Sequence, residues 1–143
     1  MVGEWAMAEA AQIGMQANVL LVEDEPLIGD AVAQALEEQG FAVETVLSAE
    51  EAVCRLADEA SIDLLFTDLC LPGSMDGAAL ARRAREMRPD LPVIYTSGRQ
   101  QMIDHLDPVE GAMFLPKPYD LFKLGRLLQY LIVAKRTRAG AFA

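Results

Sequence analysis

Acidic, hydroxyl and basic side chains follow the short apolar runs of this sequence, where buried strands would end. They are Glu23 and Asp24 after the first run, Asp68 after the third, and Ser97 and Lys117 after the last two. Carboxylates held close together repel one another, and a divalent cation such as Mg²⁺, which prefers oxygen ligands and keeps several waters, relieves that repulsion. A carboxylate beside the metal can attack a phosphoryl group, while the metal and a lysine stabilise the transferring oxygens. The set therefore predicts phosphoryl transfer to an aspartate.

Each of these residues also has a simpler explanation when it is taken alone. Acids after the first run are favoured at a helix start by the helix dipole. An aspartate such as Asp68 is common in loops, and Ser97 before Gly98 is a common turn pair. Lys117 between two prolines, directly after an apolar run, is harder to explain in this way. The order of all four groups, each behind an apolar run, favours a site.

Alternating strand and helix patterns position these residues. Apolar runs without polar alternation are typical of strands in a parallel sheet covered on both faces. The predicted strands are 19–22, 41–47, 64–66, 93–95 and 112–115. The predicted helices are 26–39, 48–59, 76–88, 101–106 and 119–133. Ser48 and Asp76 are the predicted N-caps of the second and third helices, and Glu51 would complete a capping box with Ser48. The core-facing stripe of the first helix would consist of Ile28, Ala31, Val32, Ala35 and Leu36.

This alternation predicts a doubly wound α/β fold with a five-stranded parallel sheet and five helices in three α/β/α layers. We expect the flavodoxin-like strand order 2-1-3-4-5, in which ligands bind beyond the carboxyl ends of the strands. One domain would span 17–134, after an extension at 1–16 that is flexible or partly helical and before a tail at 135–143.

Composition excludes several classes of function. The formal net charge of −10 argues against direct DNA binding, because such binding depends on basic residues that neutralise phosphates. No apolar run is long enough to cross a membrane and the N-terminus lacks a signal-peptide pattern, so we expect a cytoplasmic protein. Cys54 and Cys70 form no CxxC pair, and the single histidine, His105, predicts no zinc site.

Five separated segments resemble the signature segments of receiver domains of two-component response regulators. These segments are Asn-Val-Leu-Leu-Val-Glu-Asp-Glu-Pro at 18–26, Asp-Leu-Leu-Phe-Thr-Asp-Leu-Cys-Leu-Pro at 63–72, Met-Asp-Gly at 75–77, Pro-Val-Ile-Tyr-Thr-Ser-Gly at 92–98 and Leu-Pro-Lys-Pro-Tyr at 115–119. The resemblance implies that Asp68 accepts a phosphoryl group from a histidine kinase or a histidine phosphotransfer protein. It also implies that Glu23, Asp24, Asp68 and the backbone carbonyl of Cys70 hold Mg²⁺ or Mn²⁺.

The same resemblance assigns the switch. Lys117 would contact the phosphoryl group, Ser97 would move toward it, and Phe114 would turn inward as Ser97 moves. The Lys117–Pro118 peptide would be cis, an isomer found mainly before proline. The chain departs from the family in carrying Glu23 where aspartate is commoner, and in one extra residue in the loop 72–77. Residues 100–108 have few apolar anchors, so we expect a mobile or partly irregular switch segment.

Output must come from the receiver surface if the domain stands alone, as we expect. In the last predicted helix, Leu121, Leu124, Leu128 and Leu131 form a core-facing stripe, and Phe122, Arg126, Tyr130 and Val133 form a second, partly apolar face. That face predicts a homodimer or a downstream protein partner through the last helix and strand, although ordinary burial would also explain it.

Three other interpretations stay open. The chain could be a receiver segment of a hybrid histidine kinase or of a longer regulator, or an interaction module that works without phosphorylation. A metal-dependent phosphatase of the haloacid-dehalogenase type would need an aspartate two residues after Asp68, where this chain has Cys70. We therefore expect a switch that turns over no external substrate.

Overall fold

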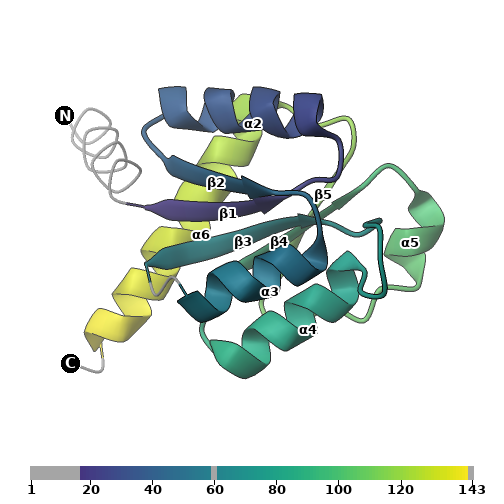
Figure 1. Ribbon diagram of the computed structural model, residues 1–143. Helices are drawn as coiled ribbons and strands as arrows, with labels where there is room; N and C mark the ends of the chain where they lie inside the picture. The colour runs from purple at the N-terminus through teal and green to yellow at the C-terminus, as the bar shows by residue number, and fades with distance from the viewer. Residues whose placement is uncertain (1–16, 59–60, 142–143) are drawn as a thin grey trace.

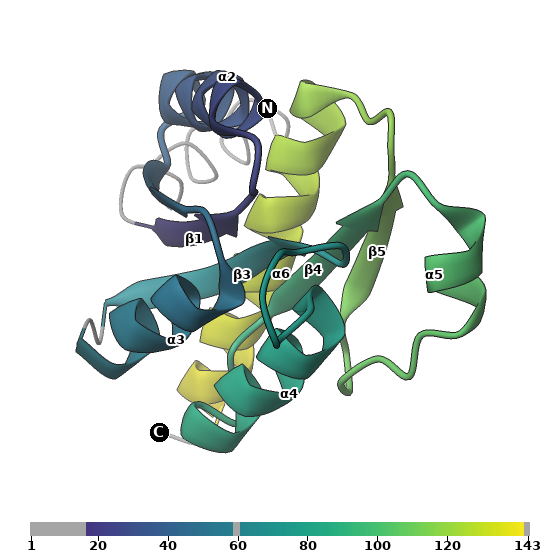
Figure 2. The same cartoon turned by 45° about the vertical axis from the view of Figure 1, so that its right-hand side comes forward.

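The computed structural model describes residues 17–58 and 61–141, in which strands and helices alternate (Figures 1 and 2). The strands are β1 (Asn18–Val22), β2 (Ala42–Val46), β3 (Ile62–Asp68), β4 (Val93–Ser97) and β5 (Met113–Pro116). The helices are α2 (Pro26–Glu38), α3 (Ala49–Asp58), α4 (Gly77–Met87), α5 (Gln100–Asp104) and α6 (Leu121–Ala141). The predicted extension at 1–16 lies outside the described residues.

The five strands form one parallel sheet in the order β2-β1-β3-β4-β5, which confirms the predicted topology. Because the strands are parallel, their carboxyl ends lie at one edge of the sheet. The register places Asp68 beside Thr96, and Ser97 beside Pro116, the residue that precedes Lys117. The topology therefore brings the predicted site residues to the same edge.

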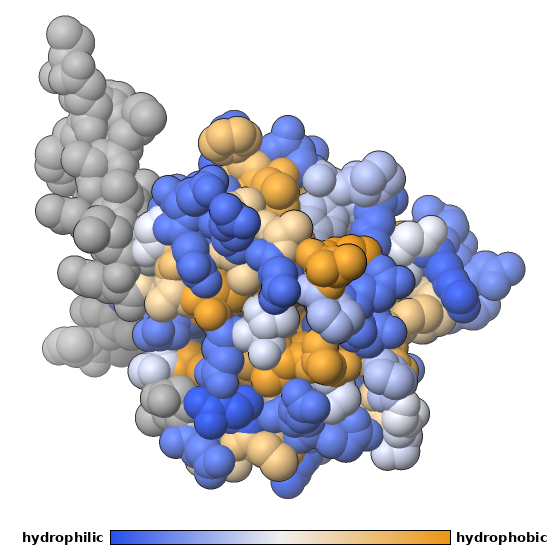
Figure 3. All heavy atoms as spheres, turned by 45° about the horizontal axis from the view of Figure 1, so that its top comes forward, coloured by the Kyte–Doolittle hydropathy of each residue, from blue (hydrophilic) through white to orange (hydrophobic). Residues whose placement is uncertain are grey.

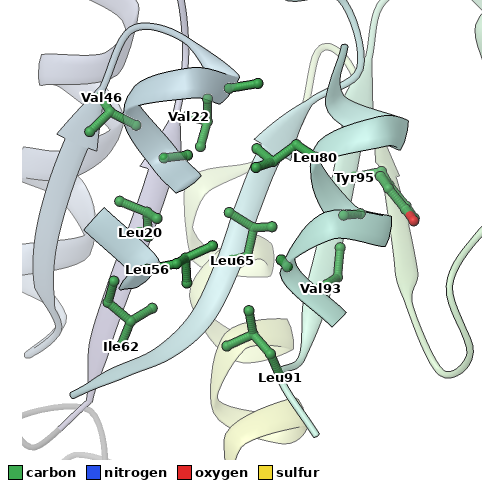
Figure 4. Packing of buried hydrophobic residues seen from close by; sticks show 14 of the residues in the cluster. Leu20, Val22, Val46, Leu56, Ile62, Leu65, Leu80, Leu91, Val93 and Tyr95 are labelled. Atoms are coloured by element: carbon green, nitrogen blue, oxygen red, sulfur yellow. The ribbon is translucent and has the colours of Figure 1, made fainter. Parts of the chain in front are cut away.

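Two apolar clusters hold helices to opposite faces of the sheet. On one face, Leu20, Leu65 and Val93 pack with residues of α3 and α4, as Figure 4 shows for Leu56 and Leu80. On the other face, alternate residues of the same strands pack against α2 and α6. Burying each large apolar side chain of this kind stabilises the fold by about 1.5–3 kcal/mol. The face of the molecule drawn in Figure 3 has hydrophilic areas with apolar areas between them.

The helix starts follow the predicted capping signals. The Ser48 hydroxyl accepts a hydrogen bond from the Glu51 amide at 3.2 Å, and the Glu51 carboxylate accepts one from the Leu47 amide at 3.2 Å. Glu51 thus reaches one residue before the N-cap, further than in a standard capping box. Asp76 caps α4 by accepting a hydrogen bond from the Ala79 amide at 2.8 Å.

Three details differ from the predictions. Ala31 was predicted on the core-facing stripe of α2 but is exposed, whereas Ala33 is buried. Helix α6 continues through Ala141 instead of ending at Val133, because residues 134–139 are mostly good helix formers and contain no glycine or proline. Ile28 was predicted in the core but is 40% exposed, whereas Gly29 beside it is buried. Among the described residues, no helix is long and apolar enough to span a membrane.

Candidate functional site

A cleft of about 390 Å³ lies at the carboxyl edge of the sheet and contains the predicted chemistry-bearing residues. Its lining comes from the ends of β1, β3, β4 and β5 and the loops that follow them. The lining residues are Glu23, Asp24, Glu25, Asp68, Cys70, Ser97, Gly98, Arg99 and Lys117. Segments far apart in the sequence therefore meet at one position, as the alternating fold predicts.

The Asp68 carboxylate is buried and held from two sides. Its Oδ1 accepts a hydrogen bond from the Cys70 backbone amide at 3.0 Å, and its Oδ2 accepts one from Lys117 Nζ at 2.6 Å. Only 6% of the residue is exposed, so solvent screens these charge-assisted contacts weakly. The two contacts fix the orientation of the carboxylate toward the cleft.

Glu23 and Lys117 complete a charged group around Asp68. Lys117 Nζ lies 3.5 Å from the Glu23 carboxylate. Desolvation raises the pKa of Glu23, the negative charge of Asp68 raises it further, and Lys117 opposes both. Desolvation alone would lower the pKa of Lys117, but the hydrogen bond to Asp68 and the charges of Asp68 and Glu23 raise it overall. The Lys117–Pro118 peptide is cis, as the resemblance implied.

Three carboxylates in the cleft are arranged as a metal site requires. Carboxylate oxygens of Glu23, Asp24 and Asp68 lie within 4.8 Å of one another. Glu23 and Asp68 are buried, whereas Asp24 is exposed and leaves one side open to water. Hard oxygen donors with an open side suit Mg²⁺ or Mn²⁺. The residues present therefore fit a divalent cation of this class.

Of the two residues predicted to form the switch, Ser97 lines the cleft that contains Asp68, whereas Phe114 does not. The Ser97 hydroxyl accepts a hydrogen bond from the Arg99 amide at 3.0 Å, so the loop after β4 holds it. Phe114 is half-buried on β5 and pairs in register with Tyr95 on β4. Ser97 thus lies on β4, the strand next to β3, and Phe114 lies on β5, one strand further out.

Gly77 and Tyr119 lie next to the site, and the sequence alone predicted no role for either residue. A Cβ on Gly77 would overlap the carbonyl oxygen of Asp68, and the Gly77 amide donates to the Leu69 carbonyl at 3.0 Å. Tyr119 packs edge-on against Phe66 with ring centroids 5.7 Å apart, and desolvation raises its pKa to about 12. In the sequence, the Asp-Gly pair at 76–77 points to Gly77, whereas the contact of Tyr119 is visible only in the tertiary packing.

The family model for the response regulator receiver domain matches residues 19–129. The chain belongs to this family. It is 34% identical over 116 residues to the transcriptional regulatory protein TcrA of Mycobacterium tuberculosis, covering 80% of this chain and 45% of TcrA. It is also 30% identical over 133 residues to the sensor kinase CckA of Brucella abortus, covering 90% of this chain and 14% of CckA. The receiver chain thus spans less than half of either relative.

Solved receiver structures have the same fold. A response regulator receiver protein from Sinorhizobium medicae has a TM-score of 0.78 and 30% identity, with 83% of this chain and 96% of the other aligned. The receiver domain of the hybrid histidine kinase CckA has a TM-score of 0.70 and 31% identity, with 81% and 99% aligned. Receivers similar to this chain therefore occur both in response regulators and in a hybrid kinase.

Proposed function

We propose that this receiver accepts a phosphoryl group on Asp68 from the phosphohistidine of a histidine kinase or a histidine phosphotransfer protein, and that the modification switches contacts with other proteins. The observation that carries the proposal is the setting of the Asp68 carboxylate. It belongs to a metal-compatible cluster of acids and is hydrogen-bonded to Lys117 at 2.6 Å. An ionised carboxylate needs no base to act as a nucleophile.

Each group at the site would have a separate role in the reaction. Glu23, Asp24, Asp68 and the Cys70 carbonyl would hold Mg²⁺ or Mn²⁺, which when bound neutralises charge on the transferring oxygens. The Cys70 amide orients Asp68 as one of its carboxylate oxygens bonds to phosphorus. The phosphorus–nitrogen bond of the donor breaks, and its electron pair stays on the imidazole. Lys117 then pairs with an oxygen of the incoming phosphoryl group.

Ser97 and Phe114 would change position in response to the phosphoryl group. Ser97 would release the Arg99 amide and donate its hydroxyl proton to a phosphoryl oxygen. Phe114 would then move toward the space that Ser97 leaves, changing the surface formed by β4, α5 and β5. No external small-molecule substrate is turned over in this scheme, because the products are the modified receiver and the unphosphorylated histidine of the donor protein.

Incubation with acetyl phosphate and Mg²⁺, followed by intact-mass measurement, tests the acceptor. We expect one added phosphoryl group in the wild type and none in Asp68→Asn. Asp90→Asn is the matched control, because Asp90 is exposed in the turn before β4 and lies outside the cleft. An unmodified wild type under these conditions would instead favour the interaction module that works without phosphorylation.

The β5–α6 surface is the output face in this proposal. Phe122 is 74% exposed and Tyr130 is 65% exposed, and a groove of about 700 Å³ runs between β5 and the start of α6. We propose that a second copy of the chain covers this surface, because exposed aromatic side chains beside a groove are typical of protein interfaces. Sedimentation with and without beryllofluoride tests the dimer, and Phe122→Asp should weaken it. A monomer at high concentration in both states contradicts it.

The similarity to the CckA receiver favours a second arrangement, in which this receiver works inside a hybrid kinase or a longer regulator. A receiver that stands alone and a receiver inside a hybrid kinase differ in the phosphodonor that they prefer. A phosphorylated histidine phosphotransfer protein and a phosphorylated kinase core, supplied at equal concentrations, would compete to modify Asp68. Faster exchange with the phosphotransfer protein would support the hybrid-kinase arrangement, because such receivers pass the group onward.

A further inference from the structure

The β3–α4 loop, residues 69–76, leaves Asp68 and returns to it. At its start, the Cys70 amide donates to Asp68 Oδ1 at 3.0 Å. At its end, Gly77 lies against the Asp68 backbone and donates its amide to the Leu69 carbonyl at 3.0 Å. Any displacement of the loop therefore acts on the backbone around the proposed phosphoryl acceptor.

The tip of this loop contacts Glu50, in the first turn of α3. The Ser74 hydroxyl donates to the Glu50 carboxylate at 3.2 Å. Gly73 has a φ of +92°, a conformation that favours glycine, and an added Cβ would lie 3.0 Å from Glu50 Oε1. The chain therefore passes directly over the carboxylate. This is also the loop whose length differs from the common pattern of the family.

The charge of Glu50 is stabilised in this position. Its own backbone amide lowers the pKa of the carboxyl group most, against opposing desolvation, and the Ser74 hydroxyl and the amides of Ser74 and Met75 lower it further. Glu50 is thus an ionised acceptor facing several donors, three of which belong to Ser74 and Met75 in the loop. Hydrogen bonds to an ionised acceptor are stronger than neutral ones.

We propose that Glu50 is a positioning residue that fastens the β3–α4 loop to the start of α3 and so holds the Cys70 backbone in place beside Asp68. The proposal rests on the proposed function, because Cys70 then serves the acceptor and the metal site. Helix α3 is a firm base for this contact. It is capped by Ser48, and Ala49 and Ala52, on either side of Glu50, are fully buried.

The loop has a second possible anchor in the core. Leu71 and Met75 are half-buried and pack against the cluster between the sheet and α3 and α4. If these apolar contacts alone fixed the loop, removal of Glu50 would leave the Cys70 backbone where it is. The contribution of Glu50 to the position of the loop can therefore be measured in variants that change Glu50 and keep Leu71 and Met75.

The test uses the full chain and compares Glu50→Ala, Glu50→Gln and Ser74→Ala with wild type. Amide exchange of Ser74 and Met75 is measured without metal, and Mg²⁺ affinity by calorimetry. We expect faster exchange and Mg²⁺ binding weakened by about threefold or more in Glu50→Ala, since removing outer residues that orient ligands weakens metal binding. Glu50→Gln should restore part of both effects, because its amide oxygen still accepts from Ser74. Ser74→Ala should show a smaller loss.

Glu38→Gln is the matched control, since it removes an equal charge from an exposed position at the opposite end of α2 from the site. Unchanged loop exchange and Mg²⁺ affinity in Glu50→Ala would overturn the proposal. So would faster exchange throughout α3, which would show that the helix itself had loosened. Failure of the proposed function is a separate result, in which wild type takes up no phosphoryl group while exchange and Mg²⁺ affinity still report on Glu50.

Discussion

Helices α4 and α5 follow neighbouring strands and are built very differently. Helix α4 follows the strand that ends at Asp68, has eleven residues, is capped by Asp76, and buries Leu80, Ala81 and Ala84. Helix α5 follows the strand that ends at Ser97, has five residues, has no side-chain cap, and has no fully buried residue. The acceptor side of the site is therefore anchored more firmly than the side that carries the proposed switch.

The difference between α4 and α5 indicates where a local movement of the molecule costs the least free energy. Segments with few buried contacts open with lower free energy than the core, and switching elements are drawn from such segments. The α5 side is held mainly by half-buried side chains and by a partly buried polar contact, in which the Tyr95 hydroxyl accepts from the Val109 amide at 3.0 Å. A change at Ser97 would therefore move α5 before it moved α4.

Truncating one apolar side chain in each helix tests the comparison most strongly. Leu80→Ala should lower the free energy of unfolding by about 3 kcal/mol, because Leu80 is fully buried and its removal leaves a cavity. Met102→Ala should cost about 1 kcal/mol or less, because Met102 is only half-buried. Urea denaturation measures both values. Equal losses would show that α5 is anchored as firmly as α4.

Gly77 tests how closely α4 is joined to the acceptor. Gly77→Ala should cost about 2 kcal/mol and slow phosphorylation, because the added Cβ overlaps the Asp68 carbonyl and the backbone must shift. Gly98→Ala is the control at the start of the α5 side, where the added Cβ meets only Lys117 Cβ at 3.8 Å. Denaturation and intact-mass kinetics compare the two variants. A larger loss for Gly98→Ala would reverse the comparison.

Tyr95→Phe tests the hydrogen bond between Tyr95 and Val109 on the α5 side. The change removes the acceptor of the Val109 amide while keeping the ring, so it should cost about 1 kcal/mol. Exchange of the Val109 amide should accelerate, with little change in α4. Tyr130→Phe is the control, because Tyr130 is 65% exposed. An unchanged Val109 amide would mean that apolar packing alone holds this segment.

Alkaline pH should destabilise the folded state through desolvation of Tyr95, although the Val109 amide, which lowers the pKa, opposes this effect. Desolvation raises the pKa of Tyr95 above its ordinary value of 10.0, so the folded state favours the neutral hydroxyl. The stability that this preference contributes is fully present below pH 10 and is lost as the pH rises through the folded pKa. The stability difference between wild type and Tyr95→Phe, followed across that range, should change accordingly.

Most of the fold could be predicted because its signals are local. Unbroken apolar runs indicate buried parallel strands, and Ser48 and Asp76 mark helix starts by residue type alone. The predicted site residues converge because alternating strands and helices form a parallel sheet, in which the carboxyl ends of the strands lie at one edge. The short α5 was also predicted, from the scarcity of apolar anchors after Ser97. The positive φ of Gly73 lies in the loop 72–77, where the chain has one residue more than the common pattern of the family.

The remaining features depend on tertiary packing. Spacing alone assigned Ile28 to the core, but α2 lies close to β2 at Gly29, where a Cβ would be 3.0 Å from a Thr45 methyl group, and Ile28 is turned outward. The contact between Glu50 and Ser74 joins residues 24 positions apart, so no local pattern indicates it. The close approach of Gly77 to Asp68 likewise exists only after the loop has closed.

The smallest expected effects concern the helix caps, where the two helices can be made more alike. Asp76→Ala should cost about 1 kcal/mol, because the Ala79 amide loses its acceptor. Arg99 occupies the N-cap of α5 with extended backbone angles and provides no side-chain cap. Arg99→Asn should therefore stabilise α5 by about 0.5 kcal/mol and slow exchange of its amides. If α5 is labile for want of a cap, the substitution should also reduce its response to phosphorylation. An unchanged response would place the lability in the missing apolar anchors, which a cap cannot replace.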